Sequence, residues 1–402
     1  MRKSILLLLA AAAAAFAQYD HAQYDQYGGW TKLKGRKTGF FHVEQIGGKW
    51  WLVSPEGNAF FSKGVCHVAH TRESDSSPEP PDAAAWARET ARLLRQWNFN
   101  TVGAWSVEEM WGTGLAYTPI LNLAAAGYRD LWLKGGIPDY FSAEFQEAAA
   151  RAAERQCRTR AGDPRLLGYF TDNELRWGAD WRSKESLFDT YMKLPENAPG
   201  RRKAVEFLKS RGRTPESATE EDKAAFLELA AAEYARVCRD AIRKYDTNHM
   251  VIGCRFAGYA PEPVLRGVGP YFDVVSYNSY NPKAPVDALA RITELTGKPT
   301  MITEFSFKAM DSGLPNTKGA AKPVATQQDR ADGFAAYVEA LAESPSCVGF
   351  HWFQYRDQPK EGRRLDGENS NYGVVRIDFT PWETLTKRMT EVNAALEQRR
   401  AR

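Results

Sequence analysis

The chain has 402 residues, of which 43% are hydrophobic, and it carries 53 Lys and Arg residues against 50 Asp and Glu residues. This near balance of charge argues against a broad basic surface, so we expect neither nucleic acid nor an anionic membrane surface among its partners. The length exceeds that of an average domain but is normal for one decorated (β/α)8 barrel, a fold of ~200 to more than 400 residues.

Residues 1–17 have the pattern of a secretory signal peptide. Two basic residues precede an apolar run from Ile5 to Ala15, and small residues around Ala17 offer a cleavage site before Gln18. The run is too short to span a bilayer with ease, and nothing later in the sequence approaches the ~20 apolar residues that a membrane helix needs. We therefore expect a secreted or periplasmic protein that begins near Gln18.

The remaining sequence divides into a lead-in and one large domain. Residues 18–39 begin with a polar, tyrosine-rich stretch, which favours a flexible lead-in. Residues 40–53 place aromatic and β-branched residues on both sides of Gly47 and Gly48, the signature of a β-hairpin that would cap the domain. The domain itself is predicted to occupy residues 40–402.

Eight short apolar runs alternate with segments of helical periodicity. This alternation is typical of a closed parallel sheet in an α/β protein, so we predict a (β/α)8 TIM barrel. The strands are predicted at residues 59–66, 100–105, 117–123, 166–174, 250–256, 272–280, 299–305 and 347–355. The main helices are predicted at residues 82–97, 142–158, 220–245, 285–296, 327–344 and 383–399. The longest insertion, residues 176–247, follows the fourth strand and should overhang its end.

The cysteines show no metal-binding or redox spacing. They number five, with no CxxC pair, and three of them fall in strand-like apolar runs, which favours buried free thiols: Cys66, Cys157, Cys238, Cys254 and Cys347. A disulfide between Cys157 and Cys238, which lie on two predicted helices, remains an alternative for an exported protein.

Two of the predicted strands end in carboxylates. Asp172, Asn173 and Glu174 close the fourth strand. Glu304 closes the seventh, where pleat alternation lets it face the barrel axis together with Ile302. Two glutamates across the mouth would straddle a sugar ring at the ~5–5.5 Å of a retaining glycosidase, one a protonated acid and the other an ionised nucleophile. The alternative for either is a structural carboxylate paired with an arginine.

Five segments in this order resemble the agarase-like glycoside hydrolases of the retaining clan A. They are residues 49–58 (KWWLVSPEGN), 168–174 (GYFTDNE), 302–307 (ITEFSF), 348–357 (VGFHWFQYRD) and 366–369 (DGEN). The resemblance implies the (β/α)8 barrel and a retaining β-glycosidase that needs no cofactor. Its implied substrate is a galactan-type polysaccharide or oligosaccharide with β-galactosidic linkages.

The resemblance also implies roles for individual residues. Glu174 would be the acid/base and Glu304 the nucleophile. Asn173 would hold the sugar 2-hydroxyl, Tyr280 would donate a hydrogen bond to the nucleophile, and Trp352 would form an apolar floor under the ring. Strict alternation puts Asn173 and Glu174 on opposite faces of a strand, so both reach the site only if the strand ends in a bulge or turn.

Further substrate contacts are expected at other strand ends. Trp105 and Trp177 are candidates for aromatic platforms, because a flat ring matches the apolar face of a pyranose, although tryptophans in a large barrel are more often core. Arg255 and Asn278 are candidates for polar contacts, with a rim salt bridge as the alternative for Arg255. His67 is a candidate for a substrate hydrogen bond, with rim packing as the alternative.

Other readings of these residues lead to other functions. His67 and His70 form an HxxH pair, but no acidic ligand at helical spacing accompanies it, so we expect no metal. Asp172 is expected to support the acid through hydrogen bonds, and His351 to be structural. The alternatives are a retaining β-glycosidase acting on β-glucan or β-mannan, a non-catalytic carbohydrate-binding barrel and a metal-dependent barrel hydrolase.

Overall fold

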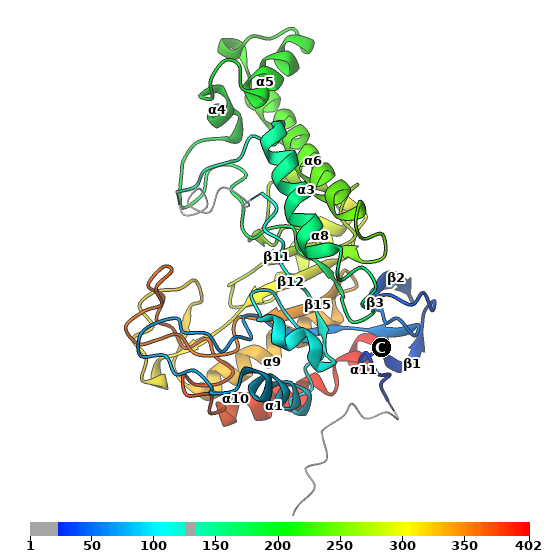
Figure 1. The fold of residues 1–402 in the computed structure, drawn as a ribbon, viewed down its shortest axis with the longest axis vertical. Helices are drawn as coiled ribbons and strands as arrows, with labels where there is room; N and C mark the ends of the chain where they lie inside the picture. The colour runs from blue at the N-terminus through cyan, green and yellow to red at the C-terminus, as the bar shows by residue number, and fades with distance from the viewer. Residues whose placement is uncertain (1–22, 125–133) are drawn as a thin grey trace, which may run out of the picture.

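The computed structural model describes residues 23–124 and 134–402 (Figure 1). The predicted signal peptide and the first residues of the lead-in lie outside the described residues. Within those two ranges, no helix is both long and apolar enough to cross a membrane.

A four-stranded antiparallel sheet comes first in the described chain, in the order β1 (Trp30–Lys34), β4 (Asn58–Phe60), β3 (Lys49–Val53) and β2 (His42–Ile46). β2 and β3 form the predicted hairpin, which is confirmed. Gly47 and Gly48 make its turn at φ values of 59° and 77°, a conformation that a Cβ would strain.

The predicted flexible lead-in is corrected where it meets this sheet. Trp30 of β1 pairs with Ala59 of β4. Ahead of it, the buried Asp25 accepts hydrogen bonds from the backbone N–H of Gly29 at 2.8 Å and from Asn58 Nδ2 at 2.6 Å. The polar composition misled because this edge strand is held by ladder hydrogen bonds and a buried carboxylate rather than by apolar side chains.

A parallel sheet of seven strands forms the centre of the described fold, in the order β10 (Phe256–Ala257), β11 (Val275–Asn278), β12 (Thr300–Phe305), β15 (Cys347–Trp352), β5 (Ser62–Val65), β6 (Thr101–Val102) and β7 (Ala116–Tyr117). β8 (Gly168–Tyr169) and β9 (Met250–Val251) pair in parallel beside it. The α/β class predicted from the sequence is therefore confirmed.

Backbone hydrogen bonds connect the short sheet to the long one. The N–H of Leu121, beyond β7, donates to the carbonyl of Phe170, beyond β8, at 2.9 Å, and the N–H of Asp273, ahead of β11, donates to the carbonyl of Val251 in β9 at 2.8 Å. β9 leads into β10 within a few residues. Because all these strands run parallel, their carboxyl ends lie toward one end of the fold, where loops collect functional side chains.

Helices follow most of the strands: α1 (Ala83–Gln96), α3 (Ala143–Cys157), α6 (Glu220–Arg243), α7 (Glu262–Val268), α8 (Val286–Thr296), α9 (Gln327–Glu343), α10 (Glu383–Asn393) and α11 (Leu396–Ala401). Shorter elements are η1 (Glu108–Thr113), η2 (Pro215–Ser217), η3 (Met310–Ser312), β13 (Lys308–Ala309) and β14 (Pro323–Val324). α1 and α3 begin at the predicted caps, where Asp82 and Ser142 accept hydrogen bonds from the first turn. The single helix predicted at 383–399 is broken at Ala394 and Ala395.

The long insertion forms an arm that stands away from the sheets in Figure 1. It contains α4 (Leu187–Met192), α5 (Pro199–Ser210) and the first half of α6. Its interior is aromatic, with the Phe226 ring 5.8 Å from those of Phe188 and Tyr191. The base of the arm returns to the strand ends as predicted, because Arg182 donates to the carbonyl of Glu174 at 2.9 Å.

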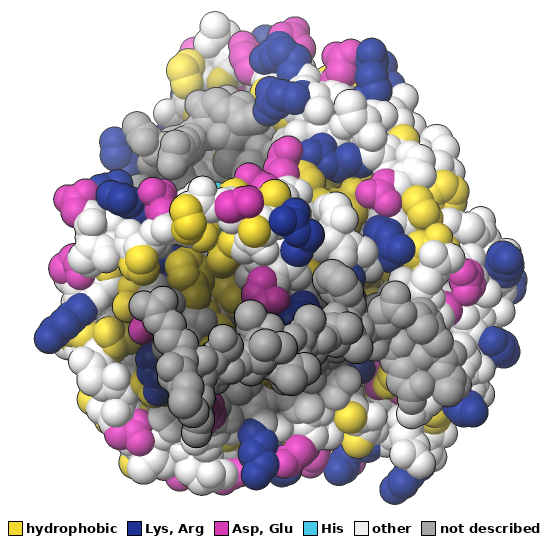
Figure 2. Space-filling model, turned by 60° about the horizontal axis from the view of Figure 1, so that its bottom comes forward, with side chains coloured by type: hydrophobic (Ala, Val, Ile, Leu, Met, Phe, Trp, Pro, Cys, Tyr) yellow, Lys and Arg dark blue, Asp and Glu magenta, His cyan; other side chains and the backbone are white. Residues whose placement is uncertain are grey.

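The mixed charges on the surface agree with the near balance of charge in the composition, and the cysteines are free thiols. Figure 2 shows Lys and Arg side chains interspersed with Asp and Glu over the face it draws. All five cysteines are free and buried, so the disulfide left open between Cys157 and Cys238 is not formed.

Candidate active site

Residues that follow several parallel strands take a left-handed backbone conformation. Just beyond β5 to β9, φ is positive at five side-chain-bearing positions, which we call the left-handed rim: His67 (51°), Trp105 (67°), Asn122 (53°), Glu174 (49°) and Arg255 (50°). This conformation is uncommon for such residues and clusters at functional sites. At Glu174 the left-handed conformation supplies a turn at the end of the strand. Such a turn is what Asn173 and Glu174 need if both side chains are to reach one site.

Glu304 ends β12 as a buried carboxylate with both oxygens occupied. Its side chain is 6% exposed. Arg255 donates to Oε1 at 2.7 Å, and the hydroxyl of Tyr280 donates to Oε2 at 2.7 Å. Burial and the charge of Glu304 raise the pKa of Tyr280 well above its ordinary value, so the phenol keeps its proton. A cation and a hydroxyl on opposite oxygens stabilise the ionised carboxylate.

Arg255 is the hub of the site. It is fully buried, and its guanidinium also donates to Asn173 Oδ1 at 2.7 Å and to the carbonyl of Thr303 at 2.9 Å. Burial by itself would lower the pKa of Arg255, but the carboxylates of Glu304 and Glu174 raise it above its ordinary value. The arginine therefore stays charged, and the rim salt bridge weighed for it is made to Glu304.

Glu174 lies in a different environment, partly buried and facing a neutral donor. Asn278 Nδ2 donates to its Oε1 at 2.9 Å. Burial, reinforced by the nearby charge of Glu304, raises the pKa of Glu174 to about 7. A carboxyl with such a pKa can hold a proton near neutral pH and release it when needed, which is the property of a general acid/base.

Two asparagines connect the glutamates. Asn278 Nδ2 also lies 3.2 Å from Asn173 Oδ1, and Asn278 Oδ1 accepts from the hydroxyl of Thr303 at 2.9 Å. Asn173 Oδ1 thus accepts from both Asn278 and Arg255, which fixes the orientation of its amide. Its NH2 group makes no hydrogen bond to the described residues and is placed to donate to a ligand.

Asp172 lies behind the site in the expected supporting position. It is fully buried and accepts hydrogen bonds from the backbone N–H of Ala124 at 2.9 Å and from the hydroxyl of Tyr234 at 2.7 Å. These contacts tie the end of β8 to the loop after β7 and to α6. Asp172 therefore fixes the backbone that carries Asn173 and Glu174.

Trp352 is not the floor of the site. Its side chain is fully buried, Nε1 donates to the carbonyl of Tyr372 at 2.9 Å, and the ring packs 5.7 Å from Phe334 of α9. Trp352 therefore points from β15 toward the helix layer. Its neighbour His351 points to the other face, where Nε2 lies 3.0 Å from Ser62 Oγ, and burial lowers its pKa to about 3.

Phe353, which the sequence did not single out, points away from α9 and packs near Tyr280, the donor to Glu304. Its ring centroid lies 6.3 Å from that of Tyr280 and 5.7 Å from that of Tyr372. Because Tyr280 contacts Glu304, Phe353 belongs to the wall beside that carboxylate. The signal that could have found it is its place one residue further along the same apolar run.

The two candidate tryptophans separate into core and site. Trp177 is 5% exposed and packs against Tyr140 and Tyr234, with ring centroids at 5.6 and 5.4 Å, so its prediction as a substrate platform is wrong. Tyr234 of α6 and Tyr140, ahead of α3, pack against the Trp177 ring and bury it. Trp105 is 36% exposed, and its ring centroid lies 5.7 Å from the guanidinium carbon of Arg255.

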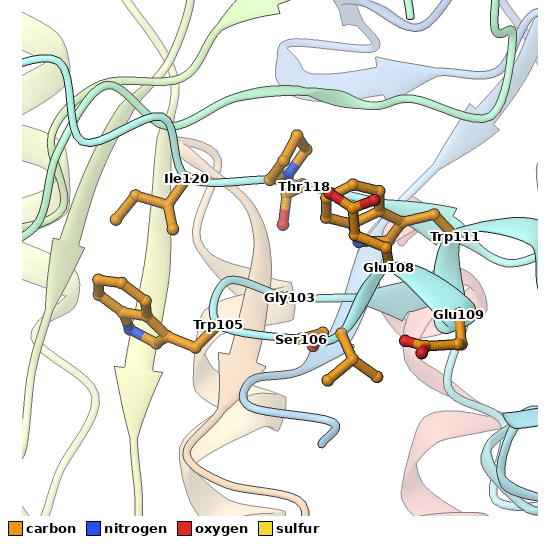
Figure 3. A pocket seen from close by; sticks show the side chains of 10 residues that line it. Gly103, Trp105, Ser106, Glu108, Glu109, Trp111, Thr118 and Ile120 are labelled. Atoms are coloured by element: carbon orange, nitrogen blue, oxygen red, sulfur yellow. The ribbon is translucent and has the colours of Figure 1, made fainter. Parts of the chain in front are cut away.

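A cavity of about 480 Å³ opens beside Trp105 at the ends of β6 and β7 (Figure 3). Figure 3 shows Trp105 and Ile120 along one side of this space and Trp111 with Glu108 along another. A flat ring, an apolar side chain and a carboxylate around such a volume fit a sugar unit, whose faces are apolar and whose edges are polar.

His67 contacts protein polar groups at the rim. Its Nδ1 lies 3.1 Å from Gln354 Oε1 and 3.3 Å from Glu73 Oε1. His70, the other half of the HxxH pair, faces Glu109 at 3.7 Å. Within residues 23–124 and 134–402, no group of three or more His, Cys, Asp or Glu side chains is arranged to hold a metal ion.

The loop after β15 is tied together by its polar residues. Arg356 donates to the carbonyls of Thr71 and Pro78 at 2.7 and 2.9 Å. Asp357 is fully buried, where it accepts from Trp382 Nε1 at 2.8 Å, and burial raises its pKa to about 6. These contacts make the arginine and the aspartate structural supports of this wall.

Known proteins similar to this chain include agarases. It is 29% identical to beta-agarase B of Vibrio sp. (strain JT0107) over 91% of its own length and 49% of that relative, and 27% identical to beta-agarase A of the same strain over 87% and 45%. The chain thus spans about half the length of these curated relatives. No family model matches it. The crystal structure of an agarase superposes with a TM-score of 0.82 at 26% identity, covering 94% of this chain and 67% of that one. The predicted resemblance to agarase-like glycoside hydrolases is therefore confirmed in sequence and in fold.

Proposed function

We propose that the chain is a secreted retaining β-glycosidase that hydrolyses β-galactosidic linkages in an agar-type galactan or its oligosaccharides. The observation that supports this most strongly is one hydrogen-bonded network that gives two glutamates different surroundings. Arg255 and Tyr280 stabilise Glu304 as an anion. Burial and the charge of Glu304 raise the pKa of Glu174 to about 7, so Glu174 carries a proton over the acidic and much of the neutral range.

In the first half of the reaction, Glu304 attacks the anomeric carbon while Glu174 protonates the glycosidic oxygen. The bond from the anomeric carbon to Glu304 forms as the bond to the leaving sugar breaks. The charge that Arg255 and Tyr280 stabilised on Glu304 disappears as the ester forms. Loss of that negative charge also lowers the pKa of Glu174, which suits it to act next as a base.

In the second half, water attacks the anomeric carbon and Glu174 takes its proton. The bond to Glu304 breaks, and the carboxylate returns to its two donors. Asn173, with its oxygen held by Arg255 and Asn278, donates its NH2 group to the 2-hydroxyl of the sugar. That hydrogen bond strengthens in the transition state, where the ring carries positive charge.

We infer that the parallel strands close into the (β/α)8 barrel predicted from the sequence. The hydrogen bonds that join β7 to β8 and β8 to β9 support this closure, since β9 continues into β10 at the far edge of the long sheet. In such a barrel the loops beyond the carboxyl ends of the strands form the active site. Glu174 and Glu304 both follow strand ends of this kind.

Export is the remaining part of the proposal. It rests on the basic, apolar and small-residue pattern of residues 1–17. An extracellular or periplasmic location suits a substrate that is a polysaccharide. N-terminal sequencing of the protein recovered from the culture medium or periplasm should find a new terminus at Gln18.

The deciding experiment is product analysis on agarose, porphyran, carrageenan, β-galactan and β-glucan oligosaccharides. We expect hydrolysis of the agar-type substrates, and proton NMR of the first products should show the β-anomer before mutarotation. The α-anomer as first product would overturn the retaining mechanism. Preference for the β-glucan would overturn the substrate class, and no hydrolysis of any member, with native folding verified, would overturn the enzymatic assignment.

A further inference from the structure

Two tryptophans stand out because their rings are exposed. Among the large hydrophobic side chains in the described part of the chain, Trp105 is 36% exposed and Trp181 is 63% exposed. Trp105 is stacked near Arg255, within the site already described. Trp181 lies in the loop that leads from β8 into the arm, and neither the network around the glutamates nor the cavity at Trp105 includes it.

The Trp181 ring is in contact with a well-anchored arginine despite its exposure. The guanidinium carbon of Arg182 lies 4.3 Å from its ring centroid. Arg182 itself has a side chain only 5% exposed and forms a bidentate pair with Asp180, with Nε and a terminal nitrogen 2.9 and 2.7 Å from Oδ2. The other oxygen of Asp180 accepts from the backbone N–H of Arg182 at 2.7 Å. A buried arginine thus covers one part of the indole and leaves the rest open to solvent.

The same arginine fixes where this ring lies. Arg182 donates to the backbone carbonyl of Glu174 at 2.9 Å. Its Cβ also packs against Gly135, where an added Cβ would come within 2.7 Å of it. Two successive contacts, from Trp181 to Arg182 and from Arg182 to the backbone of Glu174, therefore connect the exposed indole to the segment that carries Glu174.

We propose that Trp181 is the stacking platform for the leaving-group sugar of the substrate. The inference rests on the proposed function, because the group that protonates the glycosidic oxygen must lie on the leaving-group side of the bond that breaks. An exposed aromatic ring on the segment joined to Glu174 offers a flat surface to the apolar face of a pyranose, and an indole loses little conformational entropy when it stacks. Trp105, stacked near the arginine that holds Glu304 and Asn173, serves the other side of the bond.

The test compares two substrates that share the same glycosyl unit. One is an agaro-oligosaccharide, whose leaving group is a sugar, and the other is the matching glycosyl fluoride, whose leaving group is one atom. For Trp181→Ala we expect kcat/KM on the oligosaccharide to fall roughly 10-fold to 30-fold further than on the fluoride. Trp181→Phe, which keeps a ring, should recover most of this difference. Trp105→Ala should reduce kcat/KM on both substrates by similar factors.

Binding supplies a second readout. The Glu304→Gln chain titrated with the same oligosaccharide should show a tryptophan fluorescence change that is reduced when Trp181→Phe is added. A parallel change for both substrates in Trp181→Ala, or no change on the oligosaccharide, would overturn this role while leaving the proposed function intact. If the native chain hydrolyses neither substrate, the proposed function fails, and the assignment of Trp181 fails with it.

Discussion

Around Glu304 a buried arginine and a tyrosine each donate to one carboxylate oxygen, whereas around Glu174 a neutral amide donates to one. Of the two donors to Glu304, Arg255 lies between β9 and β10 and Tyr280 lies just beyond β11. The amide that faces Glu174 belongs to Asn278, the last residue of β11. Asn278 of β11 and Tyr280 just beyond it therefore serve different glutamates.

This difference shows how one fold gives two identical side chains different surroundings. The chemistry of a carboxyl is set by the charge and burial of its neighbours rather than by its own identity. Here Arg255 contacts Glu304 directly at 2.7 Å, whereas its hydrogen bonds toward Glu174 run through Asn173 and Asn278. The difference between the surroundings of the two glutamates depends on the position of Arg255. Each prediction below changes a different residue in or beside this network.

The largest effect is expected from Glu304→Ala. Without the nucleophile, kcat should fall by about 10⁴-fold or more, the scale seen when an enzyme loses its covalent nucleophile. Azide should restore part of the turnover by occupying the vacated space. Glu391→Ala, on the exposed side of α10, is the matched control and should retain native activity. Activity near the native level in Glu304→Ala would contradict the assignment.

Glu174→Gln should lower kcat/KM on oligosaccharides by about 10²-fold to 10⁴-fold, the range for a general acid. It should also change the pH profile. Because the acid must carry its proton and its pKa is raised to about 7, native activity should be present below that pH and lost as the pH rises through it. The measurement is kcat/KM against pH for both chains, and an alkaline limb that persists unchanged in the variant would exclude Glu174 as its source.

Arg255→Lys should come next, with a fall of about 10²-fold in kcat/KM. Lysine keeps the charge but lacks the fork that contacts Glu304, Asn173 and the carbonyl of Thr303 together. Tyr280→Phe removes one donor and leaves the ion pair intact, so its loss should be smaller. Steady-state kinetics of both variants checks the order, and a larger loss in Tyr280→Phe would show that the tyrosine rather than the arginine dominates.

The smallest catalytic effect is expected from Trp352→Phe. Because the indole packs against α9 and away from the site, the substitution should lower the free energy of unfolding by about 1–2 kcal/mol with little change in kcat/KM. Phe353→Leu, one residue along, keeps an apolar side chain of similar volume and should mainly lower kcat/KM. Urea unfolding and kinetics of the two variants separate these outcomes, and a common pattern in both would contradict the assignment of the two faces.

The sequence allowed most of the strands and helices, and the positions of Glu174 and Glu304 at strand ends, to be predicted, because all three leave periodic or terminal signals. A carboxylate at the end of a buried apolar run, as at Glu304, is visible without a structure. The helix caps at Asp82 and Ser142 could be predicted for the same reason, because Asp and Ser side chains accept hydrogen bonds from the N–H groups of the first helical turn.

What the sequence could not predict depends on the direction of single side chains. Trp352 and Phe353 are neighbours of similar character, and only the packing of α9 decides which of them faces the site. Trp177 looked like a platform because it follows a strand, but tyrosines distant in sequence bury it. The role of Arg255 as a hub likewise depends on a left-handed turn, which no local pattern of residues announced.

The left-handed rim has a consequence for how this chain could be changed. Each of its five residues holds a backbone conformation that costs on the order of 1–3 kcal/mol, and four of them carry side chains with an expected part in the chemistry. Glycine would relieve that strain at every position and would delete the side chain that the strain serves. At Arg255 glycine would also leave the buried Glu304 carboxylate without its ion pair, so the strain there is outweighed. At the half-exposed Trp105 no such pair is lost, and a screen for heat resistance alone would favour variants there that are stable but have lost one wall of the site.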